Sequence, residues 1–187
     1  MRVIAGTARG TSLVAPRGMK TRPTADRVRE ALFSILLSRC TLQGVRVLDI
    51  CAGTGALGIE ALSRGAGSCT FIERDRQALD ALRRNLSAAG MLDRSSISSV
   101  DAPAALRGLG ASGAAFDLIF FDPPYQSDLY ASVPPLVAGS RLLAPEGIMV
   151  IERASRSTPL PDCAGLIQSD SRRYGDTVLE FFTSEAA

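Results

Sequence analysis

The sequence predicts an α/β fold with a doubly wound, mostly parallel sheet that is covered by helices on both faces. From residue 44 onward, short apolar runs typical of buried strands alternate with stretches in which apolar residues recur at helical spacing. A glycine-rich loop joins the first of these strands to the first helix, as in Rossmann-like folds. The last two predicted strands have no helical stretch between them, which predicts an antiparallel hairpin at one edge of the sheet.

Residues 1–43 are predicted to form a small basic extension that packs on the main domain, residues 44–187, because the extension is too short for a core of its own. The extension is predicted to contain a β-hairpin with strands Arg2–Ala5 and Thr11–Ala15 around the turn Gly6–Gly10, a basic loop at Arg17–Pro23, and a helix at Ala25–Arg39 capped by Thr24.

The main domain follows the alternating pattern to its end. Its predicted strands are Val45–Ile50, Ser68–Glu73, Ser95–Val100, Phe116–Phe121, Gly147–Glu152, Gly165–Gln168 and Thr177–Phe182. Its predicted helices are Ala56–Arg64, Arg76–Ala89, Ala102–Leu109 and Leu129–Gly139.

Composition excludes several classes of chemistry. The chain has no histidine, which excludes histidine-based catalysis and histidine metal ligands. Its four cysteines form no CxxC pair, so we expect no metal site and reduced thiols, as in a cytosolic protein. The chain begins without a signal-peptide pattern, and no apolar run is long enough to span a membrane. We therefore expect a cytoplasmic monomer.

The glycine loop predicts a cofactor that contains adenosine. Gly53, Gly55 and Gly58 satisfy G-x-G-x-x-G between a predicted strand and a predicted helix. Glu73 ends the next strand, where a carboxylate can bind both hydroxyl groups of a ribose. Asp101 follows the third strand and is placed either to accept from an adenine amino group or simply to cap the next helix.

Asp49 favours S-adenosylmethionine over NAD. A carboxylate just before the glycine turn would repel the pyrophosphate of NAD, whereas it would stabilise a sulfonium or ammonium cation. An NAD-dependent oxidoreductase remains compatible with the glycine loop alone. The structural alternatives are a turn or cap residue for Asp49 and a solvated strand end for Glu73.

The tetrapeptide Asp122-Pro123-Pro124-Tyr125 predicts a site for a planar amine. It follows a continuous apolar run, and its prolines fix the backbone and remove two N–H donors. The Asp122 carboxylate and the Pro123 carbonyl can accept from an –NH2 group, and Tyr125 can stack on a base. With a methyl donor nearby, this predicts methyl transfer to a nucleobase amine. The structural alternative is an ordinary turn after a strand.

Four stretches together resemble one family: Arg22–Phe33, Leu48–Arg64, Ile72–Asp75 and Asp122–Tyr125. They are similar to the bacterial RsmD family, 16S ribosomal RNA guanine-N2 methyltransferases that use S-adenosylmethionine. The first stretch is the most specific, because the glycine loop and D-P-P-Y occur in many amine methyltransferases. The resemblance implies a Rossmann-like class I methyltransferase whose substrate is one guanine of 16S rRNA, in the small ribosomal subunit or its assembly intermediate.

Motifs and resemblance together assign two sets of residues. The cofactor is expected to contact Asp49, Ala52, Gly53, Thr54, Gly55, Glu73, Arg74, Asp101 and Asp122. The catalytic residues are expected to be Asp122, Pro123, Pro124 and Tyr125.

Positive charge gathers in the first thirty residues, which predicts that the extension docks RNA. The candidates are Arg9, Arg17, Lys20, Arg22, Arg27 and Arg29, with Arg22–Arg29 nearest the active site. Arg172 and Arg173 are secondary candidates. The alternative is a solvated basic face without a ligand.

Other functions remain open from the residues alone. D-P-P-Y also serves adenine-N6 and cytosine-N4 methyltransferases, although the chain offers no obvious extra domain for reading DNA. Protein-glutamine methyltransferases usually have Asn in place of Asp122. A non-catalytic RNA-binding module would leave the cofactor residues unused. The choice of guanine N2 rests on the resemblance.

Overall fold

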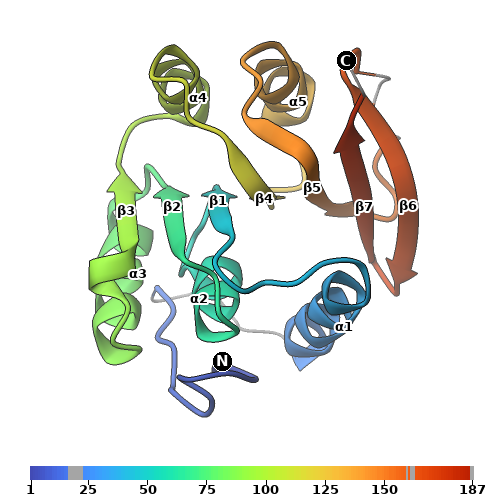
Figure 1. The fold of residues 1–187 in the computed structure, drawn as a ribbon. Coiled ribbons are helices and arrows are strands. Elements are labelled where there is room, and N and C mark those ends of the chain that lie inside the picture. Colours follow the sequence, from blue (N-terminus) through green and yellow to red (C-terminus); the bar gives the residue numbers. More distant parts are fainter. Residues whose placement is uncertain (17–22, 159, 161–162, 186–187) are drawn as a thin grey trace.

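The protein forms one seven-stranded sheet of order β3-β2-β1-β4-β5-β7-β6 (Figure 1). The computed structural model describes residues 1–16, 23–158, 160 and 163–185. The strands are β1 (Arg46–Ile50), β2 (Ser68–Ile72), β3 (Ser95–Ser98), β4 (Phe116–Phe121), β5 (Leu143–Ala154), β6 (Leu166–Tyr174) and β7 (Thr177–Ser184). The helices are α1 (Pro23–Arg39), α2 (Ala56–Ser63), α3 (Arg76–Ala88), α4 (Ala102–Ala111) and α5 (Leu129–Gly139), with a short 3-10 helix, η1 (Leu92–Arg94).

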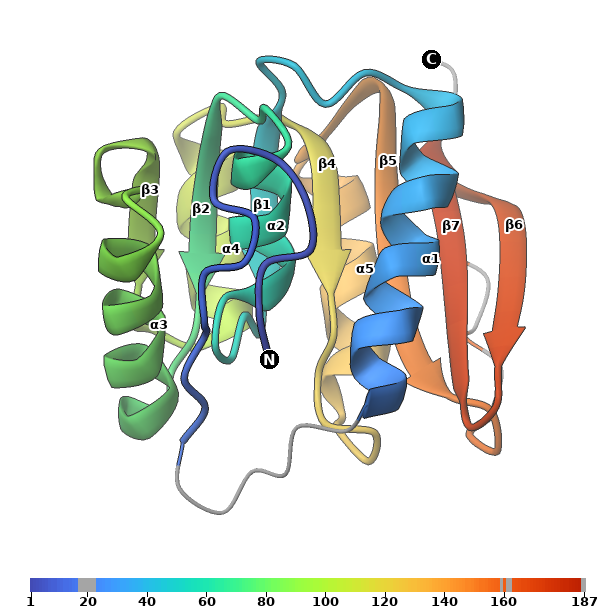
Figure 2. The same cartoon turned by 90° about the horizontal axis from the view of Figure 1, so that it is seen from below.

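The predicted doubly wound sheet is confirmed. Strands β1 to β5 pair in parallel, whereas β7 runs antiparallel to both β5 and β6 and so forms the predicted edge hairpin. Helices α1, α2 and α3 cover one face and α4 and α5 the other (Figure 2). Strand order reverses between β1 and β4, and the loops that follow these strands therefore diverge at the edge where ligands bind in such folds.

Several predicted boundaries were wrong. Strand β5 begins earlier than predicted, at Leu143, where it pairs with Phe116 of β4, and it runs on to Ala154 because it pairs with β7 there. Strand β6 continues far past Gln168 because it pairs with β7. The exposed polar side chains of β6 hid this strand from a hydrophobicity pattern. Helix α1 begins at Pro23, in the first-turn position that proline favours, so Thr24 lies within the helix and does not cap it. In the described part, no helix is both long and apolar enough to cross a bilayer.

The N-terminal hairpin is present in reduced form. Its two arms form a single antiparallel bridge between Arg2 and Ser12, supported by hydrogen bonds from Val3 N to the Thr11 carbonyl (3.0 Å) and from Gly10 N to the Val3 carbonyl (2.9 Å). Apart from Pro23, the predicted basic loop at Arg17–Pro23 lies outside the described residues.

Helix α1 belongs to the core of the main domain. The buried side chains of Leu32, Phe33 and Leu36 pack in the same cluster as Phe120 of β4 and Phe181 of β7. The rings of Phe33 and Phe120 are 5.8 Å apart between centroids. A second cluster fills the space between the sheet and helices α4 and α5. Helix α1 of the N-terminal extension therefore shares its core with the sheet.

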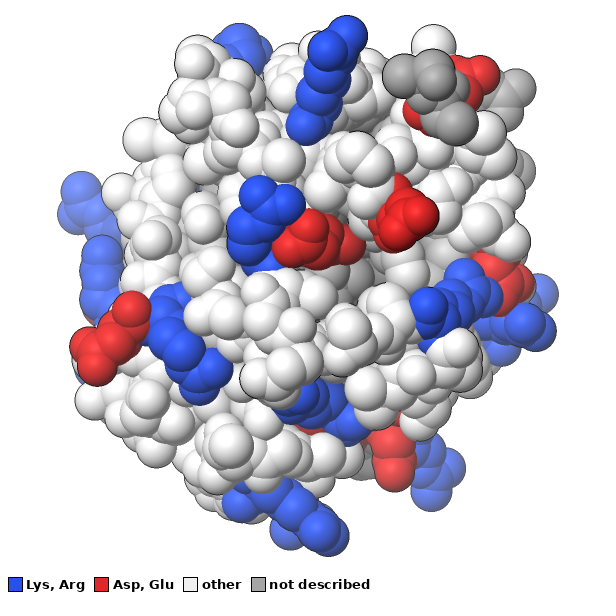
Figure 3. Space-filling model, in the orientation of Figure 1, with Lys and Arg blue, Asp and Glu red and all other residues white. Residues whose placement is uncertain are grey.

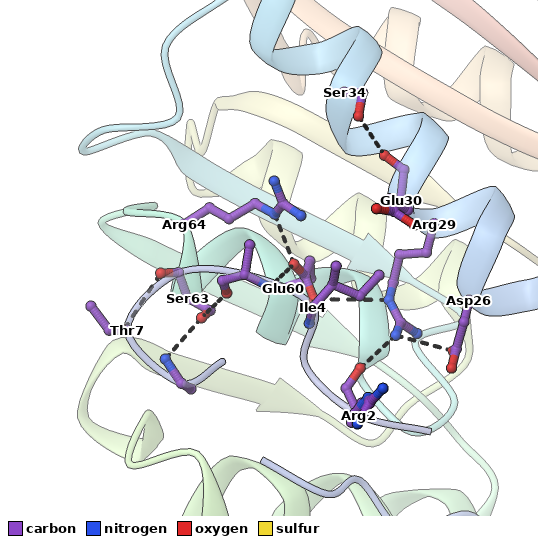
Figure 4. A network of polar contacts seen from close by, with 12 residues as sticks. Arg2, Ile4, Thr7, Asp26, Arg29, Glu30, Ser34, Glu60, Ser63 and Arg64 are labelled. Atoms are coloured by element: carbon purple, nitrogen blue, oxygen red, sulfur yellow. Dashed lines mark hydrogen bonds and ion pairs between the residues drawn. The ribbon is translucent and has the colours of Figure 1, made fainter. Parts of the chain in front are cut away.

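A buried carboxylate on α2 holds the start of the chain (Figure 4). Glu60 is fully buried and accepts from the backbone N–H groups of Ile4 (2.8 Å) and Ala5 (3.0 Å) and from Nε of Arg64 (2.7 Å). Its other charged neighbour is Arg29, whose Nε lies 3.9 Å from Oε2. The N-terminal strand is thus fixed to α2 by charge-assisted hydrogen bonds, which are stronger than neutral ones.

The prediction that Arg29 binds RNA is wrong. Arg29 is only 4% exposed and donates to the Arg2 carbonyl (2.7 Å) and to Asp26 (3.2 Å) in addition to its ion pair with Glu60. Burial lowers the pKa of Arg29, and the carboxylates of Asp26 and Glu60 oppose that shift. The cation near the start of α1 is therefore a structural counter-charge.

The turn that carries Arg9 packs on the last residue of α2. Ser63 accepts from Thr7 N through its carbonyl (2.8 Å) and from Ala8 N through its hydroxyl (3.0 Å). A Cβ at Gly6 would lie 1.8 Å from the Ser63 carbonyl oxygen, so only glycine fits. Because α2 begins at the glycine loop and spans about 12 Å, this turn lies at the opposite edge of the sheet from that loop (Figure 2).

We expect Glu60→Gln to lower the free energy of unfolding by roughly 3–5 kcal/mol, because it leaves the buried Arg29 guanidinium without its fully buried counter-charge. Asp80→Asn is the control, since the Asp80–Arg83 pair is exposed (3.7 Å) and should be worth at most about 1 kcal/mol. Urea unfolding of both variants measures the difference. Equal, small losses would contradict a structural role for the Glu60 network.

Candidate active site

Four acidic residues lie in a row along one edge of the sheet. They lie close to the carboxyl ends of adjacent parallel strands. Glu73 and Asp122 directly follow β2 and β4, whereas Asp49 and Glu152 lie within the last three residues of β1 and β5. This edge is at the lower side of Figure 2, where the strand arrows end. The position of strand reversal, between β1 and β4, lies in the middle of the row. Such an edge is where open α/β sheets bind their ligands.

The glycine loop makes a tight turn between β1 and α2. Gly53 (φ 55°) and Gly55 (φ 77°) adopt left-handed conformations, and so does Cys51 (φ 61°), which is a strained conformation for a residue with a side chain. The Glu73 carboxylate accepts from Gly53 N and from Asp75 N, both at 2.8 Å, and so fixes the loop to β2. A Cβ added at Gly53 would meet no atom within 4 Å, so a ligand has room to approach this backbone.

Asp49 is buried beneath this loop. It is 1% exposed, and its Oδ2 accepts from Gly58 N in the first turn of α2 at 2.9 Å. Burial raises the pKa of Asp49 to about 7, although the hydrogen bond from Gly58 opposes the shift. Among the described residues no lysine or arginine forms an ion pair with it. A buried carboxylate without a cationic partner suits a cationic ligand.

The thiol of Cys51 lies among the acids. Burial, helped by the negative charges of Glu73, Asp122 and Asp49, raises the pKa of Cys51 to about 12. The thiol is therefore neutral at physiological pH and a poor nucleophile.

Asp101 caps α4. Its side chain accepts from Ala104 N at 2.9 Å, as the helix-capping alternative predicted. The residue is exposed, and within the described part of the chain its second carboxylate oxygen makes no hydrogen bond. Contact with an adenine amino group stays a prediction.

Asp122-Pro123-Pro124-Tyr125 follows β4, with Asp122 exposed at the edge of the sheet. The surrounding protein and the carboxylates of Glu152 and Asp49 raise the pKa of Asp122 well above its usual range. Tyr125 is 41% exposed, and its hydroxyl donates to Oε1 of Glu152 (3.2 Å) and lies 3.3 Å from the hydroxyl of Thr177. These contacts orient the ring and leave part of it open to solvent.

Sequence reasoning missed Glu152 and Tyr130. The Tyr130 hydroxyl donates to the Glu152 carbonyl at 2.8 Å and lies 3.4 Å from the Pro123 carbonyl. It thereby links the tetrapeptide to the end of β5 and leaves the Pro123 carbonyl weakly occupied. Glu152 ends a predicted strand in the same way as Glu73, and that shared position was a usable signal.

Asn85 also helps to position the glycine loop, and no sequence pattern indicated this role. Its buried amide accepts from Val14 N (2.8 Å) and donates to the carbonyls of Val14 (3.0 Å) and Thr54 (2.9 Å). One side chain of α3 therefore joins the N-terminal segment to the glycine loop.

The RNA-docking candidates are spread over different parts of the molecule. Arg27 is exposed in the second turn of α1, which starts at the carboxyl edge of the sheet (Figure 2). Arg9 is exposed in the turn that packs on Ser63, the last residue of α2, and so lies toward the opposite edge. Arg17, Lys20 and Arg22 lie outside the described residues.

Figure 3 looks onto the opposite edge, where positive side chains are scattered and interspersed with acidic ones. An exposed ion pair there joins Arg46 to Asp117 at 2.9 Å. At the carboxyl edge, Arg74, Arg76 and Arg83 line a hollow of about 450 Å³ together with Asp80. Three arginines and one aspartate leave this hollow with an excess of positive charge beside the row of acids.

Comparison with known proteins identifies the family. Residues 1–183 match the family described as "Conserved hypothetical protein 95". The chain belongs to this family. It is 36% identical over 152 residues to "Ribosomal RNA small subunit methyltransferase D" of Escherichia coli, covering 81% of this chain and 74% of that protein. It is also 36% identical over 178 residues to "Putative rRNA methyltransferase YlbH" of Bacillus subtilis, covering 95% of each.

The structure of "Putative methyltransferase yhhF from Escherichia coli" has the same fold. It is 32% identical, covers 100% of this chain and 99% of its own, and superposes with a TM-score of 0.84. The predicted membership of the RsmD family and the class I methyltransferase fold are confirmed. The protein is a methyltransferase.

We expect Asp49→Asn to change the pH dependence of stability. Asp49 has a pKa of about 7 when folded but an ordinary value of 3.8. Between these pH values the folded state holds the extra proton, so the wild-type free energy of unfolding falls as pH rises, by at most about 1.4 kcal/mol per unit. Asn cannot ionise, so the variant should gain stability relative to wild type between pH 5 and pH 8.

Urea unfolding of both proteins at these two pH values measures the effect. Glu152, whose pKa is also raised, is present in both proteins and cancels in the comparison. The Asp49 charge is one of the causes of the raised pKa of Asp122, so its removal lowers the pKa of Asp122 and adds to the relative gain in stability in the same direction. A stability difference that is the same at pH 5 and pH 8 would contradict the buried, uncompensated carboxylate.

Proposed function

We propose that this methyltransferase transfers a methyl group from S-adenosylmethionine to the exocyclic N2 amine of a guanine in 16S rRNA of the small ribosomal subunit. The observation that carries the proposal is the adjacency of two sites across the point of strand reversal. A carboxylate suited to a cation, Asp49, lies one residue before the end of β1, and an amine-accepting group, Asp122 with the Pro123 carbonyl, follows the neighbouring β4. The names of the relatives, small-subunit rRNA methyltransferases, support this substrate.

The residues present fit the cofactor. Asp49 offers a buried negative charge for its cationic groups, and the open backbone at Gly53 allows close approach. Glu73 is fixed by two N–H groups, and each of its oxygens keeps a lone pair for a ribose hydroxyl. The remaining proposed contacts are Ala52, Thr54, Gly55, Arg74, Asp101 and Asp122.

When bound, S-adenosylmethionine supplies an electrophilic methyl group, so that the nitrogen–carbon bond forms as the carbon–sulfur bond breaks and S-adenosylhomocysteine leaves. The protein prepares the nitrogen. Asp122 and the Pro123 carbonyl accept its two N–H groups, which directs its lone pair toward the methyl group. Asp122 also stabilises the positive charge that develops on nitrogen. The proton that leaves the nitrogen goes either to the Asp122 carboxylate or, by way of Asp122, to water.

The base must leave its stack to reach this edge. Tyr125 would stack on it, with the ring held in place by the hydrogen bonds of its hydroxyl to Glu152 and Thr177. The exposed part of the ring provides the surface for this contact.

The start of α1 is proposed to dock the RNA. Arg27 is exposed near the carboxyl edge, where a phosphate of the substrate backbone would pass. Arg17, Lys20 and Arg22 are proposed to act with it, and Arg9 would contact a more distant part of the subunit. Arg74 and Arg76 add positive charge on the α3 side of the same edge.

We further propose that the protein acts as a monomer in the cytoplasm without a metal ion. The ribosomal substrate supports the compartment. For the metal, the described residues contain no group of three or more His, Cys, Asp or Glu side chains placed to bind one. The proposed chemistry needs only the carboxylates and carbonyls of the site.

We expect Asp122→Ala to lower the rate of methyl transfer by about 100-fold or more, because the amine loses its main acceptor. The affinity for S-adenosylhomocysteine should stay within a few-fold, since the glycine loop and Glu73 are untouched. Tritiated-methyl transfer to unmodified small subunits and calorimetric titration measure the two quantities. Asp117→Ala, at the other end of β4, is the matched control and should keep full activity. Full activity of Asp122→Ala would overturn the role of this residue.

We expect Arg27→Glu to weaken binding to small subunits and to lower the slope of log affinity against log salt concentration by about one. Cofactor affinity should not change. Arg107→Glu, an exposed reversal on α4 at the other face, is the control. Filter binding over a salt series measures both variants, and equal behaviour of the two would remove Arg27 from the docking surface.

A further inference from the structure

Glu152 lies in the row of acids and holds the hydroxyl of Tyr125, but that contact uses only one of its two carboxylate oxygens. Along the sheet, Glu73 and Asp49 lie on the cofactor side of the reversal, at β2 and β1. Glu152 lies on β5, one strand beyond Asp122 in the opposite direction, where Ile151 pairs with Phe121. Its position therefore places it beside the methyl acceptor and away from the glycine loop.

The carboxylate of Glu152 is held in a defined position. Its Oε1 accepts from the hydroxyl of Tyr125 at 3.2 Å, and its carbonyl accepts from Tyr130, which also lies near the Pro123 carbonyl. Among the described residues, Oε2 receives no hydrogen bond. One fixed oxygen and one available oxygen thus stand next to the groups that receive the amine.

Guanine differs from the other amine-bearing bases at the ring atom beside its amine. Its N1 carries a proton, so the Watson–Crick edge presents the N1–H and N2–H groups as adjacent donors. In adenine and cytosine the ring nitrogen beside the amine carries a lone pair instead. An additional carboxylate next to an amine site therefore attracts the edge of guanine and repels that of adenine or cytosine.

We propose that Glu152 accepts the N1–H of the target base and so selects guanine over adenine and cytosine. The inference rests on the proposed function, since it assigns base selection to the same site. Asp122 and the Pro123 carbonyl take the two hydrogens of the amine, and the available Oε2 of Glu152 takes the proton on the neighbouring ring nitrogen. Three acceptors then match the three N–H hydrogens of this edge.

The charge state of Glu152 is consistent with this role. Burial raises the pKa of Glu152, whereas the hydrogen bond from Tyr125 lowers it. A second donor, the N1–H of guanine, favours the ionised carboxylate further, and so does a cationic cofactor nearby. Base binding and ionisation of Glu152 therefore support each other.

The test uses 2-aminopurine, which keeps the 2-amine of guanine but has a lone pair at N1. Small subunits are reconstituted with rRNA that carries either guanine or 2-aminopurine at the methylated position, which is located first by mass spectrometry of ribonuclease fragments of the methylated rRNA. The wild-type protein should prefer guanine by at least about 100-fold in kcat/KM, because a site built for an N–H donor rejects a base without it. Glu152→Gln can donate from its amide to the N1 lone pair, and should reduce this preference at least about tenfold.

Two further variants make the outcome decisive. Glu146→Gln, an exposed change at the other end of β5, should leave the preference unchanged. Tyr125→Phe keeps the ring but removes the hydrogen bond to Oε1 of Glu152, so it should also lower the preference for guanine over 2-aminopurine. This variant serves as the test if Glu152→Gln does not fold.

An unchanged preference in folded Glu152→Gln, or in Tyr125→Phe where it is the substitute, would overturn the role of Glu152. Failure of the wild type to methylate guanine-containing subunits would instead overturn the proposed function. The two failures are therefore distinguishable.

Discussion

A buried carboxylate, Asp49, joins the end of β1 to the first turn of α2, and the active site is built around this contact. The hydrogen bond to Gly58 N fixes the direction in which the chain leaves the sheet, and the glycines between them allow the left-handed turn that this direction requires. Because Asp49 is buried without an ion pair, its ionised form is destabilised, and its pKa is therefore raised. A cationic ligand would offset that cost, so the same contact that shapes the loop favours the proposed cofactor.

The N-terminal segment and the glycine loop are joined by buried hydrogen bonds through α2 and α3. Glu60 fixes Ile4 and Ala5 to α2, and Asn85 joins Val14 to the carbonyl of Thr54. Both contacts are buried and hydrogen-bonded, so they hold their partners firmly. If the N-terminal segment docks RNA as proposed, these contacts hold it in a fixed position relative to the loop that is proposed to bind the cofactor.

The sequence was sufficient for the sheet, its edge hairpin and the four motifs, because these depend on local periodicity and on turn chemistry. It was insufficient wherever a role depends on which side chains meet across the fold. Arg29 looked like a free cation near a helix start, but it neutralises Glu60, which lies 31 positions away in the chain. Glu152 looked like a strand end, and only the pairing of β5 with β4 and the hydroxyl of Tyr125 place it beside the tetrapeptide that is proposed to bind the amine. Strand β6 was predicted too short because it has few buried side chains of its own. It is held in the sheet by its pairing with β7, which a hydrophobicity pattern does not show.

The central claim is that the row of acids divides into a cofactor half and an amine-accepting half that reads guanine. Mass spectrometry of nucleosides from small subunits, after incubation with the protein and S-adenosylmethionine, tests it most directly. We expect a single new product, N2-methylguanosine, in 16S rRNA. The appearance of N6-methyladenosine or N4-methylcytidine in its place, or the absence of any methylated nucleoside, would contradict it.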